Sequence, residues 1–191
     1  MYNPPSEFHG IAPMPALPIV RLGHPALRAV AKALSAESLA SAETQQLVDD
    51  MIETMHEAHG VGLAATQVAA EVQVFVYESS GHDIPLHVVV NPMITPHERE
   101  LVYDWEGCLS IPDLRGMVPR HPAVRVQGLD RHGQPLNYLC RGFEARIVQH
   151  EFDHLNGVVF LDRMRDFKTL GYSEEWGRHM GGGDGDETAV G

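Results

Sequence analysis

Residues 149–154 read QHEFDH, so His150 and His154 stand four residues apart with Glu151 directly after the first. In an α-helix, residues at this spacing lie on one face a single turn apart, so both imidazoles can reach one metal ion. Glu151 projects to the edge of that face, where a carboxylate can hold a proton beside a metal without binding it. The stretch therefore predicts a helix that supplies two metal ligands and a base.

The flanking residues predict where this helix begins and ends. Asn156 and Gly157 follow the motif, and glycine readily adopts the left-handed conformation that ends helices. On the other side of the motif, Gly142 stands before the segment that contains the apolar residues Ile147 and Val148. We therefore expect a helix over residues 143–156. With 12 histidines in 191 residues, such a pair can also arise by chance on the surface. The adjacent glutamate and the surrounding apolar residues favour a metal site instead.

Composition describes an ordinary soluble globular protein. A length of 191 residues corresponds to one domain, with 43% hydrophobic and 21% charged residues. The 14 lysines and arginines against 26 aspartates and glutamates give a net charge of −12. Binding of a phosphate backbone needs clustered cations, so no direct DNA binding is expected.

Cysteines and hydropathy predict the compartment. Cys108 and Cys140 are the only two cysteines, which is no disulfide framework and fits a reducing environment. The first basic residue is Arg21, so the start of the chain lacks the charged region of a secretory signal. No apolar run approaches the ~20 residues of a membrane span. We expect a cytoplasmic protein with no membrane partner.

Three parts follow one another along the chain. Residues 1–18 contain five prolines and predict an extended N-terminal arm. Residues 19–170 predict a single catalytic domain. Residues 171–191 are polar and glycine-rich and predict a disordered tail.

The periodicity of residues 19–170 predicts an α+β fold. Apolar residues at helical spacing predict an amphipathic helix over residues 41–60. Strand-like runs occupy residues 72–77, 86–90, 99–103, 123–129 and 135–140, and residues 158–161 predict a short extension. The expected architecture is short antiparallel β-sheets surrounding a central metal-binding HExxH helix.

A catalytic metal usually takes three protein ligands, so a third must come from elsewhere in the chain. In one class of peptidases it is a histidine ten residues after the first, but Phe160 stands there and cannot bind a metal. In thermolysin-like peptidases it is a glutamate on a second helix, and Glu174 stands at that distance. Cys108, expected in a loop between strands, offers a thiolate, which suits zinc or iron together with two histidines. A closed structural metal site in a non-catalytic binding domain is a third alternative.

Three motifs resemble those of the peptide deformylase family: GVGLAATQ at residues 60–67, EGCLS at residues 106–110 and QHEFDHLNG at residues 149–157. The likeness runs through about residues 19–162, with the motifs in the family's order. The resemblance implies removal of the formyl group from N-formylmethionyl nascent peptides, with transient ribosome association. It also implies an antiparallel α+β fold around the metal helix and a ferrous ion that zinc, nickel or cobalt can replace.

The resemblance also implies a role for individual residues. The metal ligands would be Cys108, His150 and His154, and Glu151 would move the proton of the attacking water. The side-chain amide of Gln67 and the backbone N–H of Leu109 would stabilise the oxyanion. The substrate-binding positions would be Val61, Gly62, Gly107, Ile147 and Arg115, with Ile147 in the methionine pocket and Glu106 a candidate partner for Arg115. Asp153 and Asp162 are either supports of the site or solvated charges.

Overall fold

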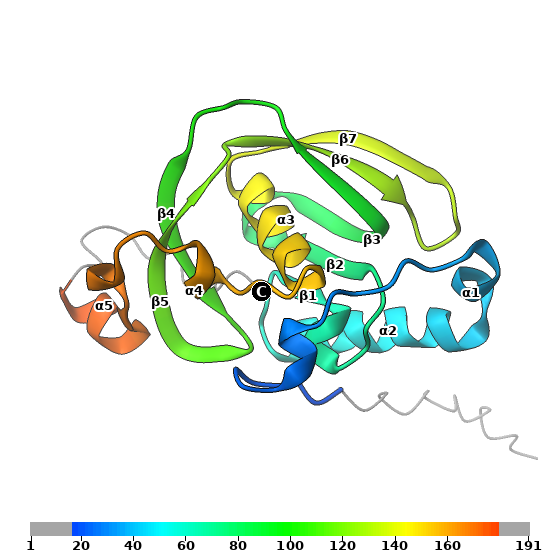
Figure 1. Cartoon of the computed structure of the whole chain (residues 1–191), viewed down its shortest axis with the longest axis horizontal. Coiled ribbons are helices and arrows are strands. Elements are labelled where there is room, and N and C mark those ends of the chain that lie inside the picture. Colours follow the sequence, from blue (N-terminus) through cyan, green and yellow to red (C-terminus); the bar gives the residue numbers. More distant parts are fainter. Residues whose placement is uncertain (1–16, 180–191) are drawn as a thin grey trace, which may run out of the picture.

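The computed structural model describes residues 17–179 (Figure 1). Almost all of the predicted N-terminal arm, and residues 180–191 of the predicted tail, lie outside this range. The helices are α1 (Ala36–Ala40), α2 (Ala42–Glu57), α3 (Gly142–Leu155), α4 (Phe160–Arg163) and α5 (Ser173–His179). The strands are β1 (Gly62–Ala64), β2 (Val74–Ser79), β3 (Ile84–Pro96), β4 (Val102–Cys108), β5 (Ile111–Arg120), β6 (Ala123–Leu129), β7 (Pro135–Arg141) and β8 (Gly171–Tyr172).

These strands form two antiparallel sheets, one in the order β1-β2-β3-β6-β7 and the other in the order β4-β5-β8. Figure 1 shows α3 in the middle of the fold, with the β4–β5 hairpin on one side and the larger sheet on the other. The predicted combination of helices with antiparallel sheets is therefore confirmed. Within residues 17–179, no helix is long and apolar enough to cross a membrane.

Strand β2 joins the two main parts of the core. Successive side chains of a strand point to opposite faces, and here both faces are covered. Phe75 and Tyr77 belong to the core cluster that contains the apolar side chains of α3. Val74 and Val76 belong to the cluster that contains those of α2. Burial of each such side chain stabilises the fold by about 1.5–3 kcal/mol, so the sheet holds α3 firmly on one face.

The ends of α3 follow from the residues predicted to set them. The helix begins at Gly142, which has a φ of +54°, and ends at Leu155. Gly157 adopts a φ of +71°, and a Cβ there would lie 2.7 Å from the carbonyl oxygen of Arg28. Only glycine fits both that conformation and that close approach. The expected helix over residues 143–156 is thus shifted by one residue at each end.

Several predicted strand boundaries were wrong. β3 runs to Pro96 rather than stopping near residue 90, because a bulge between Val90 and Met93 accommodates Asn91 and Pro92 before pairing with β6 resumes. The strand predicted over residues 99–103 is β4, which reaches Cys108. Cys108 is therefore the last residue of a strand and not part of a loop. Residues 158–161 do not extend as predicted, since α4 begins at Phe160.

The predicted disordered tail was wrong for residues 171–179. Gly171 pairs with Arg115 of β5, which makes β8 the third strand of the smaller sheet. The ring of Trp176 in α5 packs edge-on against that of Trp105, with 5.6 Å between centroids. Strand pairing and aromatic packing against β4 and β5 outweigh the weak local preference of this polar segment.

Candidate metal centre

Three buried side chains converge between α3 and the end of β4. The Sγ atom of Cys108 lies 3.3 Å from Nε2 of His154, which lies 3.2 Å from Nε2 of His150. The three candidate ligand atoms all lie within 4.8 Å of one another. One thiol and two imidazoles at this separation can share a single ion, and this donor set suits zinc or iron.

Local structure explains the convergence. His150 and His154 lie one turn apart on α3, on the face directed towards β4. β4 pairs with β5 in a hairpin whose register shifts between Glu106 and Cys108. Such an irregularity turns the strand locally and re-aims a side chain. The hairpin thus brings the cysteine beside histidines that follow it by more than forty positions.

Burial controls the charge state of these donors. It raises the pKa of the Cys108 thiol to about 12, with a further contribution from the Glu151 carboxylate. It lowers the pKa of His154, and the neighbouring His150 lowers it further. The imidazole of His154 is therefore neutral and able to bind a metal. A bound cation is what would favour the thiolate form of Cys108.

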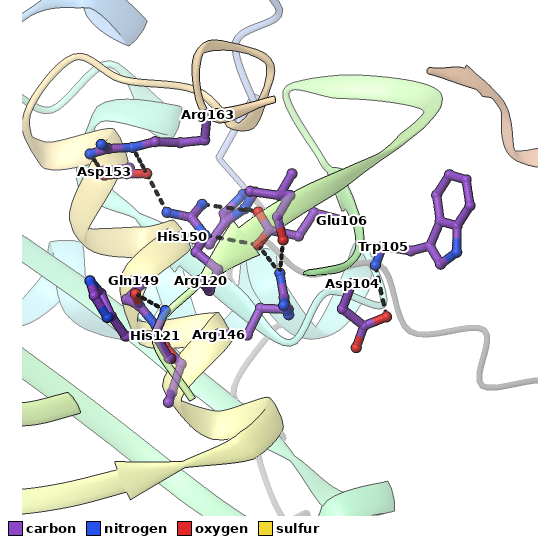
Figure 2. Close-up of polar contacts among 12 residues, drawn as sticks. Asp104, Trp105, Glu106, Arg120, His121, Arg146, Gln149, His150, Asp153 and Arg163 are labelled. Carbon is purple, nitrogen blue, oxygen red and sulfur yellow. Dashed lines mark hydrogen bonds and ion pairs between the residues drawn. The ribbon is translucent and has the colours of Figure 1, made fainter. Parts of the chain in front are cut away.

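Glu106 lies at the centre of a buried ion network (Figure 2). Its carboxylate accepts hydrogen bonds from Nε and Nη2 of Arg120 at 2.9 and 3.0 Å, from Nη1 of Arg146 at 2.8 Å and from Nδ1 of His150 at 2.9 Å. Burial alone would raise the pKa of Glu106, but the charge of Arg120 and the hydrogen bond from His150 outweigh it and hold the pKa well below its usual range. Glu106 is therefore ionised.

The contact with Glu106 fixes the tautomer of His150. An ionised carboxylate only accepts hydrogen bonds, so Nδ1 of His150 carries a proton, and in the neutral imidazole the lone pair is then on Nε2. Nε2 is the atom that faces His154 and Cys108. A carboxylate bonded to the other ring nitrogen fixes the orientation of a histidine that binds a metal.

Two arginines of this network, Arg120 and Arg146, were not predicted from the sequence as partners of Glu106. The predicted pair between Glu106 and Arg115 was wrong, because Glu106 bonds to Arg120 and Arg146 instead. Arginine is rarely buried, so composition gave no reason to place either one inside. A positional signal was present for Arg146, which precedes His150 by four residues and therefore shares its helix face.

Glu151 is fully buried beside the cluster. Neither of its carboxylate oxygens, nor Nδ1 of His154, has a hydrogen-bond partner among residues 17–179. Burial raises the pKa of Glu151 well above its usual value, and the charge of Glu106 adds to this effect. A Cβ on Gly62 would lie 2.4 Å from Oε1 of Glu151. The missing side chain of Gly62 thus leaves the space that the Glu151 carboxylate occupies.

The two predicted oxyanion donors lie next to the cluster. Nε2 of Gln67 is 3.7 Å from Sγ of Cys108 and 3.4 Å from Oγ of Ser110. Oε1 of Gln67 accepts a hydrogen bond of 2.8 Å from the Ala64 N–H, which orients the amide. Leu109 follows Cys108 directly and is half-buried.

Among the predicted substrate positions, Val61 and Gly62 lie at β1 and Gly107 lies in β4. Both strands are at the edge of their sheets among the described strands, so their free backbone groups can pair with an extended peptide. Ile147 is fully buried in the same core cluster as Val61. Arg115 lies in β5, where its guanidinium is 5.1 Å from the ring centroid of Trp176.

The side chains of the three remaining candidate residues, Glu174, Asp153 and Asp162, differ in how far they are buried. Glu174, the alternative third ligand, has a side chain 70% exposed and pairs with Arg178 on its own helix. Asp153 is buried between Arg120 and Arg163, so it is not a solvated charge. Asp162 is partly exposed and pairs with Arg28.

Comparisons with known proteins identify the family of the chain. Residues 16–169 match the family model described as polypeptide deformylase. The chain is 45% identical over 163 residues to "Peptide deformylase 2" of Pseudomonas putida, covering 82% of this chain and 92% of that protein. It is also 45% identical over 155 residues to "Peptide deformylase 2" of Nostoc sp., covering 78% and 86%.

Solved structures show the same likeness. The Met-Ala-Ser-bound class I type b peptide deformylase of Acinetobacter baumannii superposes with a TM-score of 0.75 at 39% identity, covering 78% of this chain and 100% of that one. The actinonin-bound enzyme of Synechococcus elongatus gives 0.74 at 38% identity, covering 80% and 81%. The family suggested by the three sequence motifs is confirmed, and the chain belongs to the peptide deformylase family.

Proposed function

We propose that the deformylase reaction of this chain takes place at the cluster of Cys108, His150 and His154. In this reaction water hydrolyses the formyl group from the N-terminal formylmethionine of nascent polypeptides and formate is released. The observation that carries the proposal is the convergence of three buried ligand atoms beside the buried, unpaired carboxylate of Glu151. The Met-Ala-Ser bound to the Acinetobacter baumannii enzyme supports a short peptide with N-terminal methionine as the ligand.

The cluster would hold one divalent metal ion. We propose Fe²⁺ as the physiological ion, with Zn²⁺, Ni²⁺ or Co²⁺ able to replace it, because a sulfur and two imidazoles suit all of these. When bound, the ion supplies Lewis acidity, which makes water a nucleophile near neutral pH. The chain's part is to fix the three ligand atoms and to keep His150 in the tautomer that Glu106 imposes.

Glu151 would act as the general base and then as the general acid. A raised pKa makes its carboxylate a stronger base, and burial provides that increase. Glu151 takes a proton from the attacking water as the new C–O bond forms. It returns the proton to the amine nitrogen as the C–N bond breaks, so formate and a free amino terminus leave.

Gln67 and Leu109 would bind the oxyanion that develops on the formyl oxygen. The amide of Gln67 is already oriented by Ala64 and lies beside Cys108, so it needs no rearrangement during the reaction. Fixed donors of this kind contribute about 2.7–4 kcal/mol each to the barrier reduction. The edges of β1 and β4 would pair with the peptide backbone, and Ile147 would border the methionine side chain.

A formate-release assay tests this assignment. The purified full-length chain, loaded anaerobically with Fe²⁺ or Ni²⁺, should release formate from formyl-Met-Ala-Ser in proportion to its metal content. Bound metal without formate release would point instead to a structural metal site. Action on nascent chains also predicts a cytoplasmic location and transient contact with the ribosome.

Gly62→Ala is expected to lower kcat/KM for formate release by about 100-fold, since displacing a catalytic group by 1 Å can cost this much. The added methyl group would displace the carboxylate of Glu151, which lies 2.4 Å from the Cβ position. The added Cβ would also lie within 3.0 Å of Cδ and Cγ of Glu151, so the whole side chain must shift, but metal content should stay at the wild-type level because none of these atoms belongs to the ligand group. Steady-state kinetics with formyl-Met-Ala-Ser checks this expectation.

Gly81→Ala is the matched control, because a Cβ there meets nothing within 4 Å. It should keep wild-type kinetics. Wild-type kcat/KM in Gly62→Ala would show that the position of the Glu151 carboxylate relative to Gly62 does not matter for the reaction.

A further inference from the structure

The ion network behind His150 continues past Glu106 to Asp153 and Arg163 (Figure 2). Beyond Glu106, Nη1 of Arg120 donates to Oδ2 of Asp153 at 2.5 Å. Arg163 then donates to both oxygens of Asp153, from Nε at 2.9 Å and from Nη2 at 2.6 Å. Charges therefore alternate from Arg163 inward to the carboxylate that holds His150.

The outer end of this network is the only part that reaches solvent. The side chains of Glu106, Arg120 and Asp153 are 0%, 5% and 6% exposed, whereas that of Arg163 is 49% exposed. A cavity of about 530 Å³ borders Arg120, Asp153 and Arg163 on the outer side of α3. Among residues 17–179, Oδ1 of Asp153 receives its hydrogen bond from Arg163. Without that guanidinium, water in the cavity would reach Asp153 and compete for Arg120.

The short helix α4 contacts the metal-binding face of α3 at a second point. The ring of Phe160 stacks on the imidazole of His150, with 6.5 Å between centroids and 20° between planes. Asp162 accepts a hydrogen bond from the backbone N–H of Val159 at 2.9 Å and pairs with Arg28, which holds α4 in place. α4 thus touches His150 directly through Phe160 and indirectly through Arg163.

We propose that Arg163 is a positioning residue for His150, acting through Asp153, Arg120 and Glu106. Its bidentate contact fixes Asp153, which holds Arg120 in the orientation that pairs with both oxygens of Glu106. Glu106 in turn keeps the ring of His150 aimed at the ligand cluster. The inference rests on the proposed role of His150 as a metal ligand, and it adds a surface arginine to the residues that tune that ligand.

The test compares Arg163→Gln, Arg163→Lys and Arg165→Gln in the full-length protein. Arg165 is exposed, lies in the same segment and borders the same cavity, but no described hydrogen bond or ion pair involves it. Arg165→Gln therefore removes the same charge without touching Asp153. The measurements are Co²⁺ affinity and the visible absorption spectrum of the Co²⁺ form, with urea unfolding of the metal-free proteins as a check on folding.

Arg163→Gln should bind Co²⁺ about tenfold more weakly, since loss of a residue that orients a ligand costs 10- to 100-fold. Its Co²⁺ spectrum should shift, and kcat for formate release should fall with little change in KM. Arg163→Lys keeps the charge but not the bidentate contact, so it should recover part of the affinity. Arg165→Gln should match the wild type in every measurement.

Equal Co²⁺ affinity and identical spectra for Arg163→Gln and Arg165→Gln would overturn the inference, even if the wild type releases formate normally. Hydrogen exchange at Nδ1–H of His150 in the Zn²⁺ form gives a second measurement, and it should be faster in both Arg163 variants than in Arg165→Gln. A wild type that binds Co²⁺ but releases no formate would refute the proposed function alone. The difference between the Arg163 and Arg165 variants would still support the positioning role.

Discussion

Glu151→Gln is expected to lower kcat for formate release by about 10²- to 10⁴-fold while the metal content stays at the wild-type level. Glutamine has nearly the same shape as glutamate, so it can occupy the space beside Gly62. Its amide cannot accept the proton of the attacking water. Because Glu151 lies outside the group of ligand atoms, its replacement should leave metal binding intact.

The measurements are single-turnover formate release and metal analysis on the same preparation. Glu144→Gln is a suitable control, because Glu144 lies on the same helix and its carboxylate binds the hydroxyl of Tyr77 instead of facing the cluster. It should keep nearly full activity. If Glu151→Gln kept more than a tenth of the wild-type kcat, another group would have to be the base, and the mechanism would be wrong.

Local features of the site were predictable from the sequence because they depend on helix geometry alone. His150, Glu151 and His154 are brought together by the 3.6-residue repeat, and Gly157 ends the helix for reasons of backbone conformation. Cys108 could be chosen as the third ligand only through the resemblance to a family. Its approach to the histidines depends on the register of the β4–β5 hairpin, which no local pattern specifies.

Long-range electrostatics could not be predicted in the same way. Glu106 and Arg120 meet because β4 and β5 pair, and Arg146 joins them because α3 packs against that hairpin. Arg115 seemed an equally good partner in the sequence, but it faces Trp176 of α5. The segment with Trp176 was itself predicted to be disordered, because its order depends on contacts with β5 and not on its own composition.

Glu106→Gln is expected to lower the free energy of unfolding of the metal-free protein by about 3–5 kcal/mol, the usual cost of removing one partner from a buried ion pair. In the wild type, the carboxylate neutralises two guanidinium groups, those of Arg120 and Arg146, whose side chains are only 5% and 6% exposed. Among the described contacts, a neutral amide would leave Arg120 with Asp153 as its only anionic partner and would leave Arg146 with none. Urea unfolding monitored by circular dichroism measures the difference.

Glu174→Gln provides the matched control, because Glu174 also pairs with an arginine but at a side chain that is 70% exposed. An exposed ion pair of this kind contributes about 0–1 kcal/mol, since water screens it. The two substitutions are chemically identical, so the difference between them isolates the effect of burial. If both shifted the unfolding free energy by the same small amount, the network around Glu106 would not stabilise the fold, and its role would be confined to orienting His150.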